Sequence, residues 1–473
     1  MHAYMAFAAK SKRLTAAVIA AAIAIGVSAC QSTDEILAVT DPDIINPSDI
    51  TSAAGANALR QGALARLNYA TSGGSVVSGS QTDEGIFLLG GLFADEWNNG
   101  DSFIARQEID QRVITIQNNF LTGANRALHR ARLSAEQAIQ ALAQYNPTAP
   151  AADVAEMYFV LAYVENIMGE HYCNGITFSD VVEGEQQYGS PISVTATFER
   201  ALAHADSGLA LITGNTANDQ KVRNALRVTK GRILLNLNRP ADAAAAVGTS
   251  TNGVPNSFVY QMLHSQTTRD NQIWSFNNSA RRYSVSTAEG TNGLNFATAN
   301  DPRLPICQGG DAACRAIGVT QDVRDDLTKP IYVQRIWPTR DAAVTIASGI
   351  EARMIEAEAA LRAGNASGAL AILNAARATV TGLTPLVDPG TDAARQDQLF
   401  RERAFWMFST GHRVGDMRRL IRQYGRAANA VFPTGAWHKA GNYGSDVTIP
   451  IPQAEQNNPN LPSGNETCID RVA

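Results

Sequence analysis

The sequence predicts an all-α fold, because apolar residues recur at helical spacing over much of the chain and no long run of strand-forming residues competes with them. Three apolar stripes step by three and four residues: Met157, Val160, Leu161, Val164 and Met168; Phe198, Leu202, Ala205, Leu209 and Ile212; and Ile346, Ile350, Met354, Ala357 and Leu361. Further helices are expected near residues 49–70, 118–145, 219–237, 366–380 and 392–409. The chain has 473 residues, 45% of them hydrophobic, which is enough to bury a large core.

Two segments of similar sequence indicate how these helices are arranged. "LNLNRPADAAAAV" (235–247) and "LRAGNASGALAIL" (361–373) each end one helix, turn at Asn, Gly or Pro, and begin an alanine-rich helix. Small alanine side chains allow paired helices to approach closely, as in the hairpins of tetratricopeptide repeats (TPRs). The alternative is a pair of ordinary αα-hairpins, and the long spacing between the segments excludes a regular repeat array. We therefore expect TPR-like helices at about 118–247 and 346–422, in an α-α superhelical body.

The segment between these helical regions, at about 248–345, is rich in Asn, Gly, Ser, Thr and Pro. We expect it to be a loop-rich insertion that carries minor β structure, because the stretch 271–285 contains enough β-forming residues for a strand or hairpin. Trp274, Tyr283 and Trp337 argue against disorder, since disordered segments contain few aromatic residues. Long irregular insertions of this kind are often functional.

The N-terminal residues are typical of an export signal. Lys10, Lys12 and Arg13 precede an apolar run, residues 14–27, that is short for a membrane span. The sequence Val-Ser-Ala-Cys that follows resembles a bacterial lipobox. This resemblance implies cleavage before Cys30, attachment of a diacylglycerol to its sulfur and acylation of its new amino group, with palmitate among the acyl chains. The alternative is an ordinary secretory signal followed by a chance cysteine.

This interpretation divides the chain into a signal peptide (1–29), a lipid-anchored tether (30–46) and a single domain (47–473). Several acyl chains on one cysteine would give stable membrane anchoring. The acidic pair Asp34 and Glu35 resembles the surface-export signals of Bacteroidetes-type lipoproteins. We therefore expect a protein anchored in the outer membrane and facing the cell exterior.

Cysteine usage agrees with an exported protein. With Cys30 set aside, Cys173, Cys307, Cys314 and Cys468 remain, and four cysteines allow three disulfide connectivities. Cys307 and Cys314 bracket the flexible loop "QGGDAA" and could close a short disulfide, which by elimination would leave Cys173 to pair with Cys468. The histidines are scattered and no CxxC or HxxxH pattern occurs, so we expect no metal site and no cofactor.

Composition and motifs argue against several function classes. The net charge of −5 disfavours a nucleic-acid-binding protein, which normally presents a basic face. No Ser-His-Asp arrangement, P-loop or dinucleotide-binding fingerprint is visible. Asp95 and Glu96 are adjacent, so they cannot easily face each other across a sugar as the two carboxylates of a glycosidase do. We therefore expect no catalytic residues and no enzymatic activity.

The stretch "FRERAFWMFSTGHRVGDMRRLIR" (400–422) concentrates charged residues among large apolar ones. Spacing places five of its charged residues on one helical face or across a tight turn: Glu402, Arg403, Arg413, Asp416 and Arg419. Buried charges that are paired in this way fix the relative orientation of helices, so we expect a structural ion-pair cluster. The alternative is an anion-binding site formed by the arginines.

Several motifs together resemble the SusD/RagB family of outer-membrane nutrient-binding lipoproteins. "RERAFWMFSTGHRVGDMRRL" (401–420) is similar to the family's C-terminal signature, and "VTIPIPQAEQNNPNL" (447–461) to its closing Ile-Pro-Ile-Pro segment. "RMIEAEAAL" (353–361) is similar to its Ala-Glu-Ala helix, and "ANDPRL" (299–304) to its Asp-x-Arg loop. "HYCNGITFSD" (171–180) departs from the Gly-Asp-Val-Pro-type turn that the family often has.

The resemblance implies an outer-membrane lipoprotein that binds a nutrient and delivers it to a TonB-dependent β-barrel transporter. The ligand would be an oligosaccharide, with a peptide as the alternative. Two rival functions remain open, a TPR-type assembly scaffold and a glycan-degrading enzyme. Binding of a glycan or peptide would count against the scaffold, and release of reducing ends would favour the enzyme.

Aromatic and amide side chains are the candidate ligand-binding residues, because sugars stack their apolar C–H faces on aromatic rings and offer hydroxyl groups to amides. The segment "DEWNNGDSF" (95–103) lies roughly where starch-binding family members carry tryptophan and asparagine in an N-terminal loop. The candidates are Trp97, Asn98, Asn99, Trp274, Tyr283 and Trp337. The alternative for Trp97 is burial in the core beside Leu92 and Phe93, and alternation in "IWSF" would point Trp274 inward.

Overall fold

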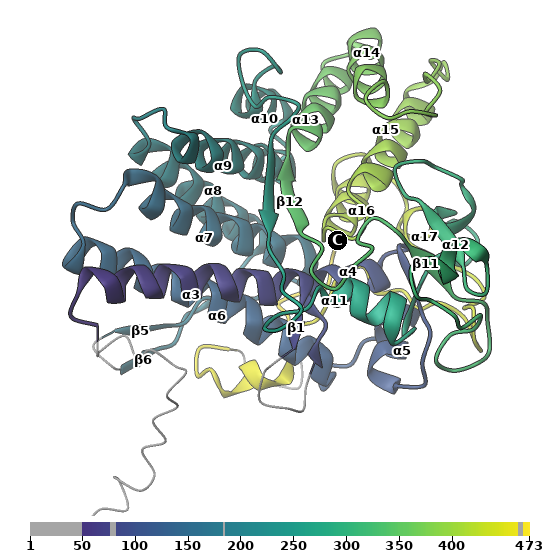
Figure 1. Ribbon diagram of the computed structural model, residues 1–473, viewed down its shortest axis with the longest axis horizontal. Helices are drawn as coiled ribbons and strands as arrows, with labels where there is room; N and C mark the ends of the chain where they lie inside the picture. The colour runs from purple at the N-terminus through teal and green to yellow at the C-terminus, as the bar shows by residue number, and fades with distance from the viewer. Residues whose placement is uncertain (1–49, 76–81, 183–184, 462–466) are drawn as a thin grey trace, which may run out of the picture. The chain divides into compact units, whose positions relative to one another are not determined.

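Helices dominate the described part of the chain, as the sequence predicted, and Figure 1 shows many of them lying side by side. The structure is a computed structural model that describes residues 50–75, 82–182, 185–461 and 467–473. The expected signal peptide, the tether and Cys30 lie outside these residues. Residues 51–473 form one compact unit. Among the described residues, no helix is both long enough and apolar enough to cross a membrane.

The helices fall into two groups on either side of the insertion. The first group comprises α3 (Ala53–Ser72), α4 (Gly85–Phe93), α5 (Ile104–Gln111), α6 (Asn119–Tyr145), α7 (Ala151–His171), α8 (Val194–Leu211), α9 (Ala217–Asn236) and α10 (Pro240–Val247). The second comprises α13 (Gly349–Arg362), α14 (Ala366–Arg377), α15 (Asp392–Trp406), α16 (Arg413–Arg422) and α17 (Ala428–Val431). The all-α prediction is confirmed, although the sequence analysis did not predict α4 and α5.

Both predicted alanine-rich hairpins are present. The turn between α9 and α10 contains Asn238 at a φ of 60°, and Pro240 then begins α10. The turn between α13 and α14 contains Gly364 at a φ of 79°, a left-handed conformation that favours glycine. Asn365 follows, and its side chain caps α14 by accepting a hydrogen bond from the Gly368 amide at 2.9 Å. Helices α10 and α13 pack against each other, so the two hairpins are neighbours in space (Figure 1).

Helix α7 lies at the centre of the first group. It packs against α3, α6, α8, α9 and α16, and it is buried almost completely along its length from Ala155 to His171. A helix that is buried nearly all round is typical of such a central position. Helix α8 instead buries one face, as its apolar stripe predicted.

In the described part of the chain, the strands are short and pair only in twos. They are β1 (Gly74–Ser75) with β2 (Thr82–Asp83), β3 (Trp97–Asn99) with β9 (Tyr283–Val285), β4 (Ile176–Thr177) with β7 (Pro191–Ile192), β5 (Asp180–Val182) with β6 (Glu185–Gln187), β8 (Val259–Met262) with β12 (Val344–Ser348), and β10 (Ile306–Gln308) with β11 (Tyr332–Gln334). All six pairs are antiparallel.

The insertion at 248–345 is ordered and is closed at its base, because β8 near its start pairs with β12 at its end. It also contains α11 (Gln272–Trp274), a π-helix (Ser275–Ser279), two short helices (Phe296–Thr298 and α12, Ala312–Arg315) and the strands β9, β10 and β11. The expectation of a strand or hairpin over 271–285 was wrong for most of the stretch. The Asn271 side chain accepts hydrogen bonds from the amides of Ile273 and Trp274, which begins a helix, and only Tyr283–Val285 is a strand.

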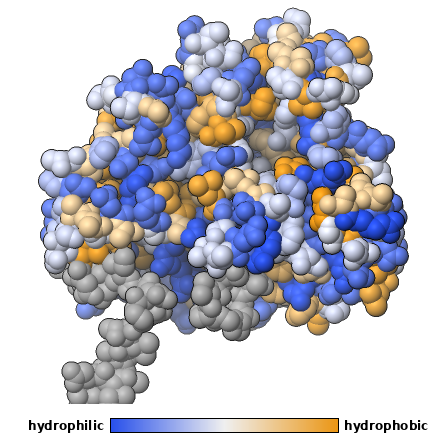
Figure 2. Space-filling view, viewed as in Figure 1, coloured by the Kyte–Doolittle hydropathy of each residue, from blue (hydrophilic) through white to orange (hydrophobic). Residues whose placement is uncertain are grey.

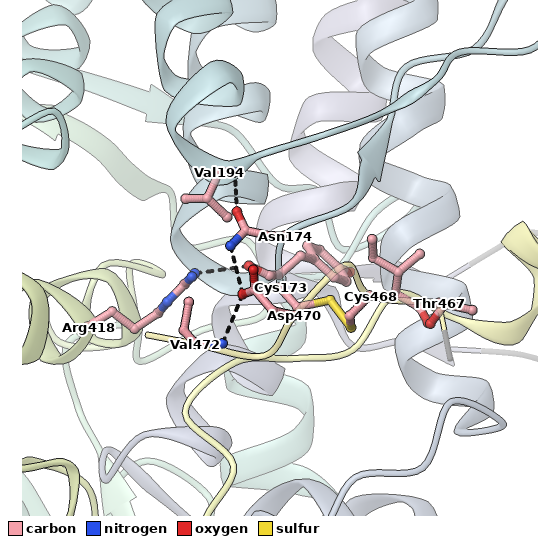
Figure 3. Close-up of a disulfide and its surroundings, with 10 residues drawn as sticks. Cys173, Asn174, Val194, Arg418, Thr467, Cys468, Asp470 and Val472 are labelled. Atoms are coloured by element: carbon pink, nitrogen blue, oxygen red, sulfur yellow. Dashed lines mark hydrogen bonds between the residues drawn. A yellow bond between two sulfur atoms is a disulfide. The ribbon is translucent and has the colours of Figure 1, made fainter. Parts of the chain in front are cut away.

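Two disulfides join the cysteines in the pairing that the sequence analysis preferred. Cys307 and Cys314, with their Cα atoms 5.5 Å apart, close a loop inside the insertion. Cys173, just after α7, is bonded to Cys468 near the C-terminus across a separation of 295 residues (Figure 3). Beside this bond, the Asn174 side chain donates to Asp470 at 2.8 Å and accepts from the Val194 amide at 2.7 Å. The C-terminal residues are thereby held against the first helical group.

Candidate functional site

Trp97, the first ligand-binding candidate, is part of the core, and this corrects the prediction that it faces a ligand. Its side chain is 0% exposed. Its indole nitrogen donates a hydrogen bond to the Ser409 hydroxyl at 3.0 Å, and its ring lies 5.0 Å from Phe408 and 6.3 Å from Tyr283. The physical reason is the pairing of β3 with β9, which places Trp97 between the insertion and the helices of the second group.

Asn98 and Asn99 are also buried, and each is committed to hydrogen bonds within the chain. The Asn98 side-chain oxygen accepts a hydrogen bond from the Arg324 guanidinium at 3.0 Å. The Asn99 amide donates to Asp110 at 2.9 Å, and its side-chain oxygen accepts from the amide of Asp101 at 2.9 Å. These asparagines therefore fasten the loop after β3 and are not available to sugar hydroxyls.

Tyr283 and Trp337 must likewise be removed from the ligand site. Tyr283 is 0% exposed, and its hydroxyl donates to the buried carboxylate of Glu84. Trp337 is buried, and its backbone amide and carbonyl both bond to the side chain of Gln334. Tyr283 thus bonds the insertion to the first helical group, whereas Trp337 is held by a neighbour inside the insertion.

Trp274 is the one candidate of this set that the structure leaves accessible. It is half-buried at the end of α11, and its indole nitrogen donates to the Pro338 carbonyl at 3.1 Å. This hydrogen bond fixes the orientation of the ring without covering it. The inward orientation suggested by strand alternation does not arise, because the residues around Trp274 are helical.

Trp274 lines a hollow of about 430 Å³, which we call the Trp274 hollow. Its lining residues come from α11, the π-helix, the residues that flank these two helices and the loop before β12: Asp270, Gln272, Trp274, Ser275, Phe276, Ser279, Ala280, Arg282 and Arg340. The volume falls within the range of small-molecule binding sites. A π-helical segment is rare and occurs often at functional sites, and here it forms one wall.

The Trp274 hollow combines an aromatic ring with polar groups that can take part in further hydrogen bonds. Arg340 forms a two-pronged ion pair with Asp270, at 3.0 and 2.7 Å, and its side chain remains 46% exposed. Arg282 forms no ion pair among the described residues, and the Ser275 hydroxyl is buried without a hydrogen-bond partner there. On the face shown in Figure 2, hydrophobic and hydrophilic residues are interspersed and no single continuous apolar patch stands out.

The charged residues at 402–419 are buried and form ion pairs within the chain. Arg403 bonds to Asp416 at 2.8 and 2.9 Å, and Arg419 bonds to Asp416 at 2.7 Å and also to Glu358 on α13. Burial by itself raises the pKa of Asp416, but the charges of Arg403 and Arg419 outweigh it and hold the pKa well below its usual range. These bonds join α13, α15 and α16.

The other two members of the predicted cluster have partners elsewhere. Arg413 forms a two-pronged ion pair with Asp95 at 2.7 and 2.8 Å. Glu402 accepts hydrogen bonds from Arg303 and Arg377, both at 2.6 Å. The five residues therefore belong to three separate ion-pair groups. Each arginine among them has an acidic partner in the chain, which favours the structural role over an anion-binding site.

Asp95 and Glu96 do not face a cleft. Asp95 is occupied by Arg413, and one oxygen of Glu96 accepts a hydrogen bond from the Ser409 amide at 2.8 Å. Burial raises the pKa of Glu96 to about 8, an effect that the Ser409 amide only partly offsets and that the charge of Asp95 reinforces. A neutral carboxylic acid at this position suits a buried structural group.

Asp110, Glu289 and His438 bring together donor atoms that could hold a metal ion, with all three atoms within 4.8 Å of one another. The imidazole, however, is engaged on both sides: its Nε2 lies 2.7 Å from Asp110 and its Nδ1 3.2 Å from Arg324. An arginine that donates to Nδ1 leaves the Nε2 proton in place for Asp110, and Arg324 already supplies a positive charge. Burial raises the pKa of Glu289 well above its usual range. We therefore assign no metal to this group.

Comparison with known proteins identifies the fold. No family model matches the sequence, and no curated protein matches it. Among solved structures, a SusD superfamily protein from Parabacteroides distasonis matches with a TM-score of 0.62 at 14% identity, over 87% of this chain and 99% of that one. A SusD-like carbohydrate binding protein from Bacteroides fragilis matches with a TM-score of 0.60 at 14% identity, over 87% and 99%.

A SusD/RagB family protein from Bacteroides thetaiotaomicron gives a TM-score of 0.60 at 10% identity, over 89% of this chain and 98% of that one. Nearly the whole of each of these proteins is therefore matched. The agreement confirms, at the level of the fold, the resemblance carried by the motifs at 353–361 and 401–420. The chain has the fold of the SusD superfamily.

Proposed function

We propose that the protein is an outer-membrane lipoprotein that binds an oligosaccharide and delivers it to a TonB-dependent transporter. The observation that carries the binding role is the Trp274 hollow, where an oriented, accessible indole lies among arginine, aspartate and hydroxyl groups. The shared fold supports the proposal, since one of the matched structures is that of a SusD-like carbohydrate binding protein.

The chemistry of the hollow suits a sugar. The indole of Trp274 offers a flat apolar face for the C–H groups of a pyranose ring. Asp270 and Arg340, already paired with each other, present charge-assisted partners for hydroxyl groups at the edge of that ring. Because the Pro338 carbonyl holds the indole in place, little side-chain freedom would be lost on binding.

Replacing Trp274 by alanine is expected to weaken oligosaccharide binding by about 2 kcal/mol or more, roughly thirty-fold, because rigid aromatic anchors often dominate binding. Titration calorimetry with a panel of neutral oligosaccharides, and with a peptide panel beside it, measures this. Trp274→Phe should retain much of the affinity, because it keeps an aromatic face.

Trp406 provides the matched control, since it is the other half-buried tryptophan and lies outside the hollow. Trp406→Ala should leave affinity per folded molecule unchanged. Unchanged affinity in a folded Trp274→Ala variant would reject the hollow as the ligand site. Preferential binding of peptides would replace the oligosaccharide by a peptide ligand.

Anchoring at Cys30 has its own test. Cells grown with a clickable fatty acid should label the wild-type protein, and Cys30→Ala should abolish the label and release soluble protein, because alanine has no sulfur to carry the diacylglycerol. Ser32→Ala, in the adjoining tether, should remain labelled. A wild-type protein that carries no label would contradict the lipoprotein assignment.

A further inference from the structure

A second hollow runs along α6 and shares no lining residue with the Trp274 hollow. It consists of two depressions of about 460 and 260 Å³. Thr122, Arg126 and Arg130 line both depressions, so the two adjoin along one face of α6. We call this continuous feature the α6 trough.

Arg126 and Arg130 give the trough a positive charge that no ion pair among the described residues neutralises. They lie one helical turn apart and are both exposed. Neither forms an ion pair among the residues that the structure describes. Like charges at this spacing on a helix are slightly destabilising. Because the net charge of the protein is −5, two neighbouring arginines without an ion pair among the described residues require an explanation.

Arg66, on the neighbouring helix α3, adds to this charge. It too lacks an ion pair among the described residues, and its pKa is lowered by burial and by the charge of Arg130. Helices α3 and α6 pack along each other, so their arginines gather on adjoining surfaces. An anionic ligand would reduce the electrostatic repulsion among Arg66, Arg126 and Arg130.

The acidic residues that line the trough or pair with Arg132 are already engaged. Arg132, buried at the base, pairs with Glu136 at 2.8 Å and with Asp180 at 2.7 Å. Glu455 is the acidic residue among the described lining of the trough, and it accepts a hydrogen bond from the Thr177 hydroxyl at 2.8 Å. Because Arg132 is paired in this way, the two arginines left in the described lining, Arg126 and Arg130, face the single carboxylate of Glu455.

The remainder of the lining is suited to a polyhydroxylated ligand. Amide and hydroxyl side chains predominate, among them Asn125, Thr177, Ser179, Gln186, Asn457 and Asn458. Tyr188 adds an aromatic side chain that is 42% exposed and can stack on a sugar ring. Amides, hydroxyls, one exposed aromatic ring and unpaired arginines together match a sugar that carries an oxyanion.

We propose that the α6 trough binds an acidic saccharide, in which Arg126 and Arg130 receive carboxylate or sulfate groups and the amides and Tyr188 contact the sugar rings. This proposal rests on the proposed nutrient-binding function, because it names the charge of the ligand. Guanidinium groups recognise carboxylate and sulfate oxygens through paired, charge-assisted hydrogen bonds.

The test is calorimetric titration of the full mature chain with three probes: an oligogalacturonate, a sulfated chondroitin disaccharide and a neutral maltooligosaccharide. The wild type should bind one or both acidic probes, and which of them binds more tightly identifies the preferred oxyanion. Arg126→Gln and Arg130→Gln should each weaken that binding about tenfold, as expected for the loss of a charge-assisted hydrogen bond. Arg335→Gln, an exposed arginine outside the trough, should leave it unchanged.

A second measurement does not depend on how the variants fold. Affinity of the wild type for the acidic probe should fall when the salt concentration rises from about 0.05 to 0.5 M, because salt screens exposed charges, whereas affinity for a neutral probe should not. The proposal is overturned if acidic probes do not bind, if Arg126→Gln and Arg130→Gln bind them like the wild type, or if an acidic peptide binds in preference. Neutral saccharide binding that Trp274→Ala removes, without acidic binding, would refute the trough alone and leave the proposed function standing.

Discussion

Replacing Asp416 by alanine is expected to lower the free energy of unfolding by roughly 3–5 kcal/mol, the range found when one partner of a buried ion pair is removed. Asp416 is buried and receives hydrogen bonds from both Arg403 and Arg419. Its loss would leave Arg403 without its closest acidic partner in an apolar environment, while Arg419 would keep Glu358. Chemical denaturation followed by circular dichroism measures the change.

Asp392 supplies the control, because it forms a surface ion pair with Arg395 while its side chain is 86% exposed. Asp392→Ala should cost less than about 1 kcal/mol. If Asp416→Ala unfolded as the wild type does but lost its ligand, the residues around Asp416 would be a binding site and the structural assignment would be wrong.

The lowered pKa of Asp416 also predicts how the stability of the protein changes with pH. The pKa of Asp416 is lower in the folded chain than its usual value of 3.8, so its contribution to stability is present above that value and is lost as the pH falls. Asp416→Asn should therefore lose less stability than the wild type when the pH is lowered from neutrality to below 3.8.

Trp97→Ala is expected to lower the free energy of unfolding by about 3–5 kcal/mol, because it opens a cavity in the core and leaves the Ser409 hydroxyl without its donor. Affinity per folded molecule should not change, since the indole is not accessible to a ligand. A thermal melt and one titration with whichever saccharide the wild type binds give both quantities.

Trp274→Ala is the natural comparison, because it removes the same side chain from a half-buried position. The two variants should show opposite patterns, with stability lost in the first and affinity lost in the second. A stable Trp97→Ala protein with reduced affinity would return Trp97 to the ligand site.

The parts of the fold that the sequence predicted are those that depend on neighbouring residues. The apolar residues of a helical stripe all lie in one helix, and the turn before α14 needs only Gly364 and Asn365 to form. The pairing of β3 with β9 depends on residues far apart in the chain, so no local pattern could show that Trp97 and Tyr283 would meet in the core. Asp95 and Arg413 are also far apart in the chain, so the sequence could not show that they would pair.

The start of the helix at Asn271 could have been predicted, because asparagine is a favoured N-cap. The β-forming residues that follow it suggested a strand instead. The charge of the α6 trough was also visible in the sequence. Arg126 and Arg130 are four residues apart, and no acidic residue lies within four positions of either. Whether such arginines find acidic partners on other helices is decided by packing, which the sequence alone does not give.

The bond between Cys173 and Cys468 makes the intervening chain a covalent ring. A protease that cuts one exposed loop of that ring opens it but releases no fragment, because both new ends remain joined through the sulfur atoms. Only a second cut, or reduction of the bond, would separate the pieces. If the protein is exported as proposed, its persistence outside the cell would depend on how many times the ring is cut, because a single cut does not separate its parts.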